Sequence, residues 1–410
     1  MFLIYTIFIQ IYLLLIRISS FFNPKAMLWL EGRRDIFKRM ESTIIHDRPI
    51  VWFHCASLGE FEQGRPVIEA FREAFPEKRI LLTFFSPSGY EIRKNYTGAD
   101  YIFYLPIDTA KNAKRFVGIA KPTLAVFVKY EYWFNYMRVL KSKNIPCIYI
   151  SAIFRPGQRF FKPWGRWQLK QLKKVDHFFV QNGTSANLLH GAGISQVTIS
   201  GDTRFDRVSG IASRKKDFPL IETFAGENHV LLAGSTWPAD EEMITGLINE
   251  NHPGLKFIFA PHEVHPERIR SLMKKLPGTS LKFSEAREEN VHNAKVLVID
   301  SIGILSHLYQ YATIAYIGGG FGVGIHNILE AATFGKPVIF GPNYSKFPEA
   351  VELIGKGGAF SINTTEQFLQ ITADLLNDAA KLRKASIIAG DYVAEKCGAT
   401  TLIMNYLKKI

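Results

Sequence analysis

The stretch IVWFHCAS, Ile50 to Ser57, is a short, unbroken apolar run that ends in small polar residues. Such a run predicts a strand buried on both faces, as the strands of a parallel sheet are. Segments with helical spacing, such as Pro66 to Phe75 and Asn112 to Ile119, separate it from later runs. Four further runs have the same character: RILLTFFS (Arg79 to Ser86), TLAVFVKY (Thr123 to Tyr130), CIYISAIF (Cys147 to Phe154) and HFFVQ (His177 to Gln181). This alternation predicts an α/β lobe built on a parallel sheet.

A second series of apolar runs follows in the other half of the chain. Its members are HVLLAGS (His229 to Ser235), KFIFAPH (Lys256 to His262), VLVID (Val296 to Asp300), ATIAYIGGG (Ala312 to Gly320) and KPVIFGP (Lys336 to Pro342). At 410 residues the chain exceeds one ordinary core, so two domains are expected. We therefore predict an α/β fold of two Rossmann-like parallel-sheet lobes facing a cleft, which matches the GT-B type of nucleotide-sugar transferase.

The expected boundaries follow from composition. The charged stretch SRKKDFPL, Ser213 to Leu220, is the best candidate for a linker. The prediction is an anchor helix over residues 1–30, a first domain over 31–212 and a linker over 213–224. The second domain would cover 225–391, and a last helix, 392–410, would pack back on the first.

The N-terminus predicts a membrane anchor, which either spans the bilayer or lies in its surface. Met1 to Ile16 is apolar except for Thr6 and Gln10, which is borderline for a spanning helix of about 20 residues. No positive charge precedes it, as a signal peptide would require, whereas positive residues follow from Arg17 onward. The positive-inside rule then places the body of the protein on the cytoplasmic side. The alternative is a buried first helix of the first domain.

The net charge of +13 requires an anionic partner. The basic residues read as spread along the chain, and no nucleic-acid motif accompanies them, so an anionic membrane surface or a phosphorylated lipid is favoured. Three widely spaced cysteines fit a reducing compartment better than a disulfide framework.

The segment IGGGFGVGIHNILE, Ile317 to Glu330, follows a predicted strand and precedes a predicted helix beginning near Asn327. Glycines let backbone amides approach a ligand, and a helix N-terminus favours phosphate. The spacing does not match G-x-G-x-x-G in any register, which disfavours a dinucleotide cofactor. Glu330 lies in the expected first turn, where it either completes a helix cap or accepts hydrogen bonds from ribose hydroxyls.

Two other segments of the second lobe lie at predicted strand ends. In GSTWPADEE, Ser235 and Thr236 either bind phosphate or cap the next helix. In APHEVHPER, His262 and His265 are three residues apart, and Pro266 disrupts the helix that a zincin site needs. No metal site is therefore expected.

In the first lobe, carboxylates follow two predicted strands. Glu60, in SLGEFEQGRP, stands where a loop turns into a helix and is a candidate general base, with Glu62 as its rival. Glu131, in VKYEYWFN, either orients a group in the cleft or pairs with Lys129. In GDTRFDRV, Arg204 either binds an anion or is a surface residue beside Asp202 and Asp206.

Taken in order, these motifs resemble bacterial 3-deoxy-D-manno-octulosonic acid (Kdo) transferases along essentially the whole chain. Nine features carry the resemblance: the N-terminal anchor, S-x-GE at Glu60, T-x-x-SPSGYE near Gly89, PID at Pro106 to Asp108, E-Y-W at Glu131, GDTRFD, GST…EE, HPER and GGG…HN-x-LEAA. Their order and spacing are specific together, although no single motif is decisive.

The resemblance implies an inverting GT-B glycosyltransferase that transfers Kdo from CMP-Kdo to the phosphorylated lipid A precursor (lipid IVA) of lipopolysaccharide. It would act without a metal or other cofactor, on the cytoplasmic face of the inner membrane. By the same resemblance, Glu60 is the general base, and Glu131 and Arg204 stabilise the transition state. Residues expected to contact CMP are Pro261, His262, Ile302, Gly303, Ile304, Asn327, Ile328, Leu329 and Glu330. Ser235, Thr236 and Arg268 are further donor-site candidates.

The chain departs from the family pattern at three places. PHEVHPER has two extra residues and places His262 where an arginine usually stands, which leaves His265 and Arg268 as candidates to replace it. Ile325 replaces a glycine of G-G-H-N and is expected to take a backbone geometry that suits glycine better. Lys129 replaces the first acidic residue of the motif at Glu131.

Two rival functions remain open from the sequence. One is a GT-B enzyme using a UDP-sugar, either a transferase or an epimerase. The other is a catalytically silent membrane scaffold. An N-terminal anchor argues against a soluble epimerase, and the joint presence of Glu60, Arg204, Asn327 and Glu330 argues against a silent scaffold.

Overall fold

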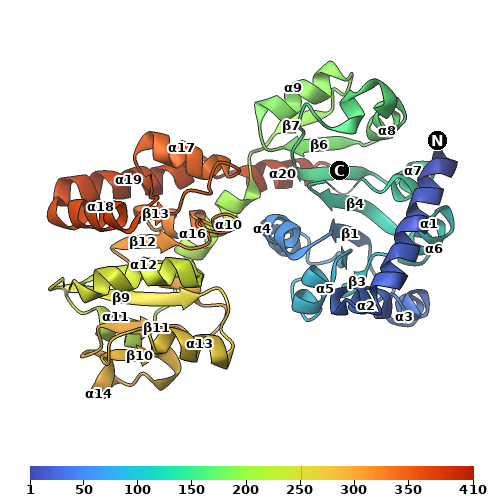
Figure 1. The fold of residues 1–410 in the computed structure, drawn as a ribbon. Helices are drawn as coiled ribbons and strands as arrows, with labels where there is room; N and C mark the ends of the chain where they lie inside the picture. Colours follow the sequence, from blue (N-terminus) through green and yellow to red (C-terminus); the bar gives the residue numbers. More distant parts are fainter. Residues whose placement is uncertain (131, 251) are drawn as a thin grey trace. The chain divides into compact units, whose positions relative to one another are not determined.

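The computed structural model describes residues 1–130, 132–250 and 252–410. The chain forms two compact units (Figure 1). Unit 1 contains Met1–Arg207 and Cys397–Ile410, and unit 2 contains Val208–Lys396. The division falls inside a helix rather than in the expected linker at 213–224, and the last residues return to unit 1.

Unit 1 is built on a parallel sheet with the order β3-β2-β1-β4-β5-β6-β7. Its strands are β1 (Ile50–Cys55), β2 (Arg79–Phe84), β3 (Tyr101–Tyr104), β4 (Pro122–Val128), β5 (Cys147–Ala152), β6 (His177–Val180) and β7 (Val197–Ile199). Its helices are α1 (Phe2–Ser19), α2 (Pro24–Glu31), α3 (Ile36–Thr43), α4 (Leu58–Ala74), α5 (Pro87–Arg93), α6 (Ala110–Ala120), α7 (Phe134–Ser142), α8 (Arg166–Leu172), α9 (Gly183–Gly191) and α20 (Ala399–Leu407). Helix α10 (Thr203–Ser213) begins in unit 1 and ends in unit 2.

Unit 2 repeats the plan, with the parallel order β10-β11-β9-β8-β12-β13-β14. Its strands are β8 (His229–Thr236), β9 (Leu255–Pro261), β10 (Ser280–Lys282), β11 (Val296–Val298), β12 (Ile314–Ile317), β13 (Val338–Phe340) and β14 (Ala359–Ser361). Its helices are α11 (Pro219–Ala225), α12 (Pro238–Asn249), α13 (Pro266–Met273), α14 (Glu288–Val291), α15 (Leu305–Leu308), α16 (Leu329–Ala332), α17 (Pro348–Lys356), α18 (Thr365–Asn377) and α19 (Ala379–Glu395). Both sheets contain the Rossmann strand order, and the predicted α/β class is confirmed.

The central strands are buried along their length, as their continuous apolar runs predict. All six residues of β1 and of β5 are buried. Helix α20 covers part of the unit 1 sheet, because Ile403, Met404 and Leu407 pack in the same apolar cluster as β1. Asp206 fixes the start of α20 by accepting hydrogen bonds from the backbone amides of Gly398 (2.6 Å) and Thr400 (2.7 Å).

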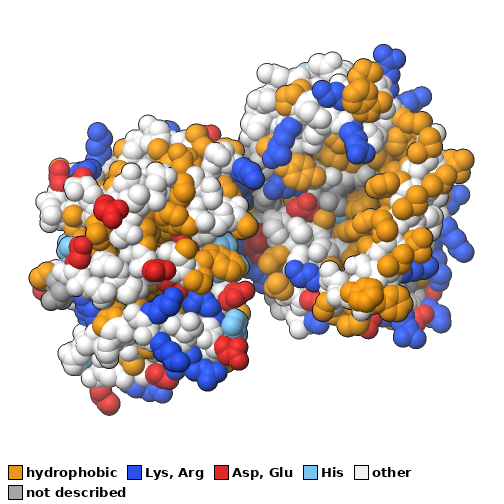
Figure 2. Space-filling view, in the orientation of Figure 1, with side chains coloured by type: hydrophobic (Ala, Val, Ile, Leu, Met, Phe, Trp, Pro, Cys, Tyr) orange, Lys and Arg blue, Asp and Glu red, His pale blue; other side chains and the backbone are white. Residues whose placement is uncertain are grey.

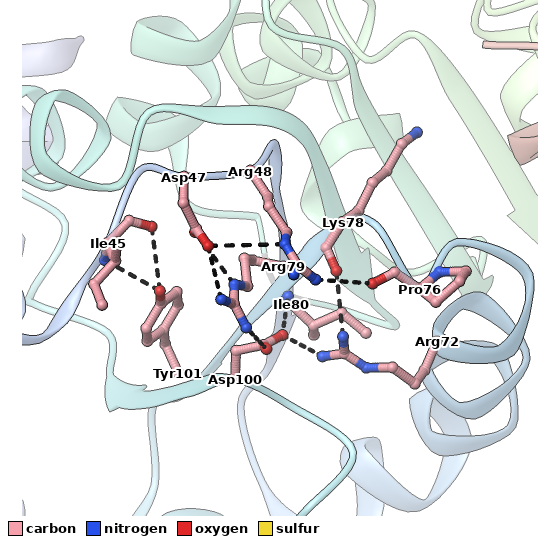
Figure 3. Close-up of polar contacts among 10 residues, drawn as sticks. All are labelled: Ile45, Asp47, Arg48, Arg72, Pro76, Lys78, Arg79, Ile80, Asp100 and Tyr101. Atoms are coloured by element: carbon pink, nitrogen blue, oxygen red, sulfur yellow. Dashed lines mark hydrogen bonds and ion pairs between the residues drawn. The ribbon is translucent and has the colours of Figure 1, made fainter.

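A polar cluster fastens the amino ends of the unit 1 strands (Figure 3). Asp100 accepts a hydrogen bond from the Ile80 amide at 2.7 Å and ion-pairs with Arg79 at 3.0 Å and with Arg72. Arg79 also pairs with Asp47 at 2.9 Å, and its hydrogen bond lowers the pKa of the Asp47 carboxyl. Ligands bind at the opposite, carboxyl ends of such strands, so this cluster is structural.

Helix α1 is the one described helix that is long and apolar enough to cross a membrane by length and composition. Only Ile9 of its 18 residues is buried, although one side of the helix packs on unit 1. The helix therefore differs from the buried first helix that the sequence offered as the alternative to an anchor.

Candidate functional site

The carboxyl end of β1 presents Glu60 in the first turn of α4. Ser57 precedes this 17-residue helix in an extended conformation, which turns the chain from strand to helix. The Glu60 carboxylate is 9% exposed and accepts a hydrogen bond from the Ala56 amide at 2.5 Å. The positive end of the helix stabilises a carboxylate at this position. Glu60 is thus held at the rim of the sheet in a fixed geometry.

Glu62, the rival base, has a different environment. Its carboxylate pairs with Arg93 at 2.8 Å and with Arg207. Two guanidinium groups on one carboxylate tie α4 to α5 and α10. Glu62 is therefore a structural ion-pair partner.

Helix α10 places Arg204 in the same part of unit 1. Its backbone amide and its Nε donate to the two carboxylate oxygens of Asp202 at 2.9 and 2.8 Å, and its Nη2 lies 2.8 Å from Asp202 Oδ2. Asp206, the other acid considered beside it, instead binds the start of α20. Asp202 thus orients the Arg204 guanidinium.

Tyr130, just beyond β4, connects these groups. Burial raises the pKa of its hydroxyl, and four charged side chains also act on it electrostatically: Arg155, Glu60, Asp202 and Arg204. The structure therefore brings Glu60 and Arg204 together around Tyr130. Tyr130 was not among the residues predicted from the sequence. Glu131, the third predicted catalytic residue, lies outside the described residues.

His54, in β1, is fully buried and lies within electrostatic range of Glu60. Its Nδ1 is 2.9 Å from Thr83 Oγ1, and its Nε2 accepts a hydrogen bond from the Trp133 indole at 3.1 Å. Burial lowers the pKa of the imidazole to about 3, although the Glu60 charge opposes the shift. A neutral His54 supports the floor of the site. An apolar strand containing a single histidine gives no sequence signal for this role.

In unit 2, the glycine-rich segment follows β12. A Cβ on Gly318 would lie 2.3 Å from the Ser235 carbonyl oxygen, and one on Gly320 would lie 2.6 Å from Gly341 Cα. These glycines allow the segment to pass directly against the ends of β8 and β13. The Gly319 amide donates to the buried Asp240 carboxylate at 3.0 Å. Close backbone packing accounts for these three glycines.

Asn327 and Glu330 are paired with each other. The Asn327 amide donates to Glu330 Oε1 at 3.1 Å, and its carbonyl oxygen accepts from the Leu329 amide at 3.2 Å. Helix α16 begins at Leu329, two residues after Asn327, and contains four residues. So short a helix has little macrodipole, so phosphate binding at its N-terminus stays a prediction that the helix dipole supports only weakly. The polar side chains of Asn327 and Glu330 remain the candidate ligand groups.

Ile325 does not have the expected glycine-like backbone. Gly324 carries the positive φ of 139°, whereas Ile325 is outside the left-handed region and is 4% exposed. The expectation fails because Gly324 absorbs the unusual conformation one residue earlier.

The ends of β8 and β9 meet at an aromatic stack. The ring of His262 stacks against Trp237 (centroids 4.7 Å) and against His326 (4.5 Å), and the Trp237 indole donates to His326 Nε2 at 3.2 Å. The His262 amide donates to the Thr236 carbonyl at 3.0 Å, beside buried Pro261. Burial and the neighbouring His262 lower the pKa of His326.

Arg268 and His265, the candidates to replace the missing arginine, differ in position. Arg268 pairs with the buried Glu241 carboxylate, which also accepts from Thr236 Oγ1 at 2.8 Å. His265 caps α13 by accepting from the Arg268 amide at 3.3 Å, and its Nε2 lies 3.5 Å from Glu263. Arg268 is thus linked to the strand end, whereas His265 has a capping role.

The other expected donor contacts are Ser235, inside β8, and the turn Ile302 to Ile304 before α15. Ser235 is in the left-handed region at φ 54°, a strained conformation for serine. Ile302 is 86% exposed, Gly303 has φ 93°, and Ile304 directly precedes α15. Among residues 1–130, 132–250 and 252–410, no three His, Cys, Asp or Glu side chains are grouped as a metal site.

Gly320→Ala is expected to lower the thermal unfolding midpoint and to weaken nucleotide binding, because its Cβ has no room beside Gly341. Overpacking of this kind costs about 1–3 kcal/mol. Gly322→Ala is the matched control, since the nearest atom to its Cβ is 3.6 Å away. Differential scanning fluorimetry with and without CMP measures both effects. Equal behaviour of the two variants would show that the close approach does not matter.

Comparison with known proteins shows which family this chain is similar to. Residues 30–207, most of unit 1, match the family model of 3-deoxy-D-manno-octulosonic-acid transferase (kdotransferase). The chain is 30% identical to the 3-deoxy-D-manno-octulosonic acid transferase of Rickettsia prowazekii, over 82% of this chain and 74% of that protein. It is 29% identical to the Rickettsia typhi enzyme of the same name, over 90% and 81% of the two chains.

Among solved structures, the chain resembles UDP-GlcNAc 2-epimerase from Neisseria meningitidis. The TM-score is 0.63 at 17% identity, with 88% of this chain and all of the other covered. At that identity the likeness concerns the fold alone, and it supports the assignment to the GT-B type.

Proposed function

This chain belongs to the 3-deoxy-D-manno-octulosonic acid (Kdo) transferase family, and from that premise we propose that it transfers Kdo from CMP-Kdo to lipid IVA, the phosphorylated lipid A precursor. The observation that carries the proposal is the arrangement at the carboxyl ends of the unit 1 strands. There, Glu60 lies in the first turn of α4, and Asp202 orients Arg204. Both Glu60 and Arg204 interact electrostatically with Tyr130.

In the proposed reaction, Glu60 removes the proton from an acceptor hydroxyl. The hydroxyl oxygen forms a bond to the anomeric carbon of Kdo from the face opposite CMP, which inverts the configuration. The bond from that carbon to the phosphate oxygen breaks, and its electron pair leaves with CMP. Arg204 stabilises the negative charge that develops, as preorganised cations do in transition states. By family resemblance Glu131 would share this role.

The donor would be held by unit 2. The proposed contacts are Asn327 and Glu330 at the end of the glycine-rich segment, together with the residues at the ends of β8 and β9. Hydrogen bonding between Asn327 and Glu330 fixes the Glu330 carboxylate, which suits it to accept from ribose hydroxyls. The exposed His262 ring, which stacks on Trp237 and His326, offers a flat surface where the family resemblance implies an arginine. The reaction is proposed to need neither metal nor cofactor.

Incubation of the protein with CMP-Kdo and lipid IVA in detergent micelles tests the proposal. The expected product is lipid IVA heavier by one or more Kdo residues, detected by mass spectrometry together with released CMP. No mass change with an otherwise folded protein would overturn it. The same assay rejects a silent scaffold if product forms.

Nucleotide choice separates the UDP-sugar alternative. CMP is expected to raise the thermal unfolding midpoint at concentrations where UDP does not, because a ligand that binds only the folded state stabilises it by an amount that grows with its concentration relative to its Kd. Differential scanning fluorimetry with both nucleotides measures this. A larger shift with UDP would favour the UDP-sugar enzymes that share the fold.

A further inference from the structure

Helix α1 has two apolar sides, of which one is packed on unit 1 and the other is exposed. One side packs on unit 1 along the length of the helix, through Phe2, Tyr5, Ile9, Tyr12 and Ile16. The other side is exposed by half or more of each side chain: Leu3 73%, Ile4 62%, Ile7 50%, Phe8 61%, Ile11 51%, Leu14 55%, Leu15 58% and Ile18 52%. An exposed apolar strip of this size marks an interaction surface.

The inner side is attached by specific contacts rather than by loose apolar packing. The Tyr5 hydroxyl donates to Asp108 Oδ2 at 2.6 Å, and Asp108 is fully buried. The Phe2 ring meets Trp167 edge-on at 4.8 Å, and the Tyr12 ring stacks with Phe85 at 6.3 Å. These partners come from separate elements of unit 1, so the helix is fastened near both ends.

The exposed strip continues beyond α1. Phe21 and Phe22, which directly follow α1 in the chain, are 81% and 89% exposed. Figure 2 shows hydrophobic side chains running along the position that α1 has in Figure 1, with Lys and Arg side chains beside them. The apolar surface is thus one band with basic residues at its borders.

Charge is concentrated in the unit that carries this band. Unit 1 has 32 Lys and Arg against 16 Asp and Glu, a net charge of +16. Unit 2 has 18 against 21, a net charge of −3, so the basic residues are not evenly spread as the sequence analysis assumed. This asymmetry indicates an anionic surface facing unit 1.

A basic cavity of about 560 Å³ lies at the end of the strip. Leu13 of α1 lines it together with five basic residues, Arg17, Arg33, Arg34, Lys38 and Arg115; Glu31 and Asp35 also contribute. Lipid phosphates would lie at this depth beside an apolar strip inserted among acyl chains.

We propose that α1 lies in the plane of an anionic lipid bilayer, with its outer side among the acyl chains and its inner side still attached to unit 1, and does not cross the membrane. A helix that lies in the plane of the membrane inserts only one side among the acyl chains. The other side of α1 is covered by unit 1. If α1 crossed the membrane, the hydrogen bond between Tyr5 and the buried Asp108 would be lost, and the apolar residues of unit 1 that Ile9 covers would be exposed. It would also stretch an 18-residue helix, about 27 Å long, over about 30 Å of hydrocarbon.

In-plane attachment has a consequence for the acceptor, which rests on the proposed function. A cavity of about 460 Å³ lies between α1 and the loops of unit 1, and its lining includes Phe8, Tyr132, Phe160 and Tyr130. Phe8 belongs to the exposed strip, and Tyr130 is within electrostatic reach of Glu60. A lipid acceptor would therefore reach the base without leaving the bilayer.

A cross-link between α1 and unit 1 tests the proposal without any sugar donor. In a Cys397→Ser background, Phe2→Cys and Trp167→Cys are joined by a short bismaleimide, since the two rings are 4.8 Å apart. Binding to vesicles of phosphatidylglycerol and phosphatidylethanolamine is measured by flotation. We expect the cross-linked protein to bind as the uncross-linked one does. Loss of binding on cross-linking would show that α1 must leave unit 1, and would overturn the proposal.

Point variants give a second readout. Ile7→Glu on the outer side is expected to weaken vesicle partitioning by roughly tenfold or more, because a charge replaces a side chain that enters the acyl region. Arg48→Gln, remote in the Asp47 cluster, is the control and should bind normally. Vesicles of phosphatidylcholine alone should bind more weakly than anionic ones. Unchanged binding of Ile7→Glu would contradict the proposal, and failure of the transfer assay alone would not affect it.

Discussion

Glu60→Gln is expected to lower kcat by roughly 10²–10⁴-fold, the usual contribution of general base catalysis. Glutamine keeps the size of the side chain and the oxygen that accepts from the Ala56 amide, so α4 should begin as before. It cannot take a proton from the acceptor hydroxyl. CMP-Kdo affinity should be unchanged, because the proposed donor contacts lie in unit 2. Steady-state transfer kinetics and CMP thermal shifts measure the two quantities separately.

Glu62→Gln is the matched control, two residues further along the same helix. It removes the charge that pairs with Arg93 and Arg207, so it should lower the unfolding midpoint while kcat stays within a small factor of wild type. If Glu62→Gln lost activity as severely as Glu60→Gln while remaining folded, the assignment of the base would be wrong.

The strands were predictable wherever they lie inside a sheet. The ten apolar runs correspond to β1, β2, β4, β5 and β6 in unit 1 and to β8, β9, β11, β12 and β13 in unit 2. The strands that the runs did not reveal are β3, β7, β10 and β14, which are the edges of the two sheets. Edge strands pair on one side only and here contain three or four residues. Their short, partly exposed sequences lack the continuous apolar character that marks the inner strands.

The choice between Glu60 and Glu62 could not be made from sequence alone. Positions two apart on a helix point in directions about 200° apart, so only one of them can face the strand ends. The partner that occupies Glu62 is Arg207, which comes from α10, some 145 positions later in the chain. Such a contact depends on the assembled unit, and nothing near Glu62 in the sequence indicates it.

The role of the glycine-rich segment could not be predicted from the sequence. A helix does follow it, but α16 is a single turn. Gly318 and Gly320 instead resolve close backbone contacts with Ser235 and Gly341, residues of neighbouring strand ends. A glycine needed for strand packing and a glycine needed for ligand approach look identical in sequence. Only the positions of the facing backbones distinguish them.

Arg204→Lys is the second change with a large expected effect, a fall in kcat of about 10²-fold, as for loss of one preorganised stabilising group. Arg204 binds Asp202 through its backbone amide, Nε and Nη2, which fixes the plane of the guanidinium before substrate arrives. Lysine keeps the charge, but its single ammonium on a flexible stem cannot reproduce that fork.

Arg207→Lys, one turn along α10, separates a local charge effect from a structural one. Arg207 pairs with Glu62, so lysine there should cost some stability and leave kcat close to wild type. Both variants should retain the CMP thermal shift. The pH dependence gives a further distinction, because Arg204→Lys keeps Glu60 and should keep the acidic limb of the kcat profile, whereas Glu60→Gln should flatten it. An Arg204→Lys enzyme with wild-type kcat would mean that the guanidinium does not stabilise the transition state and that Asp202 holds it for structural reasons alone.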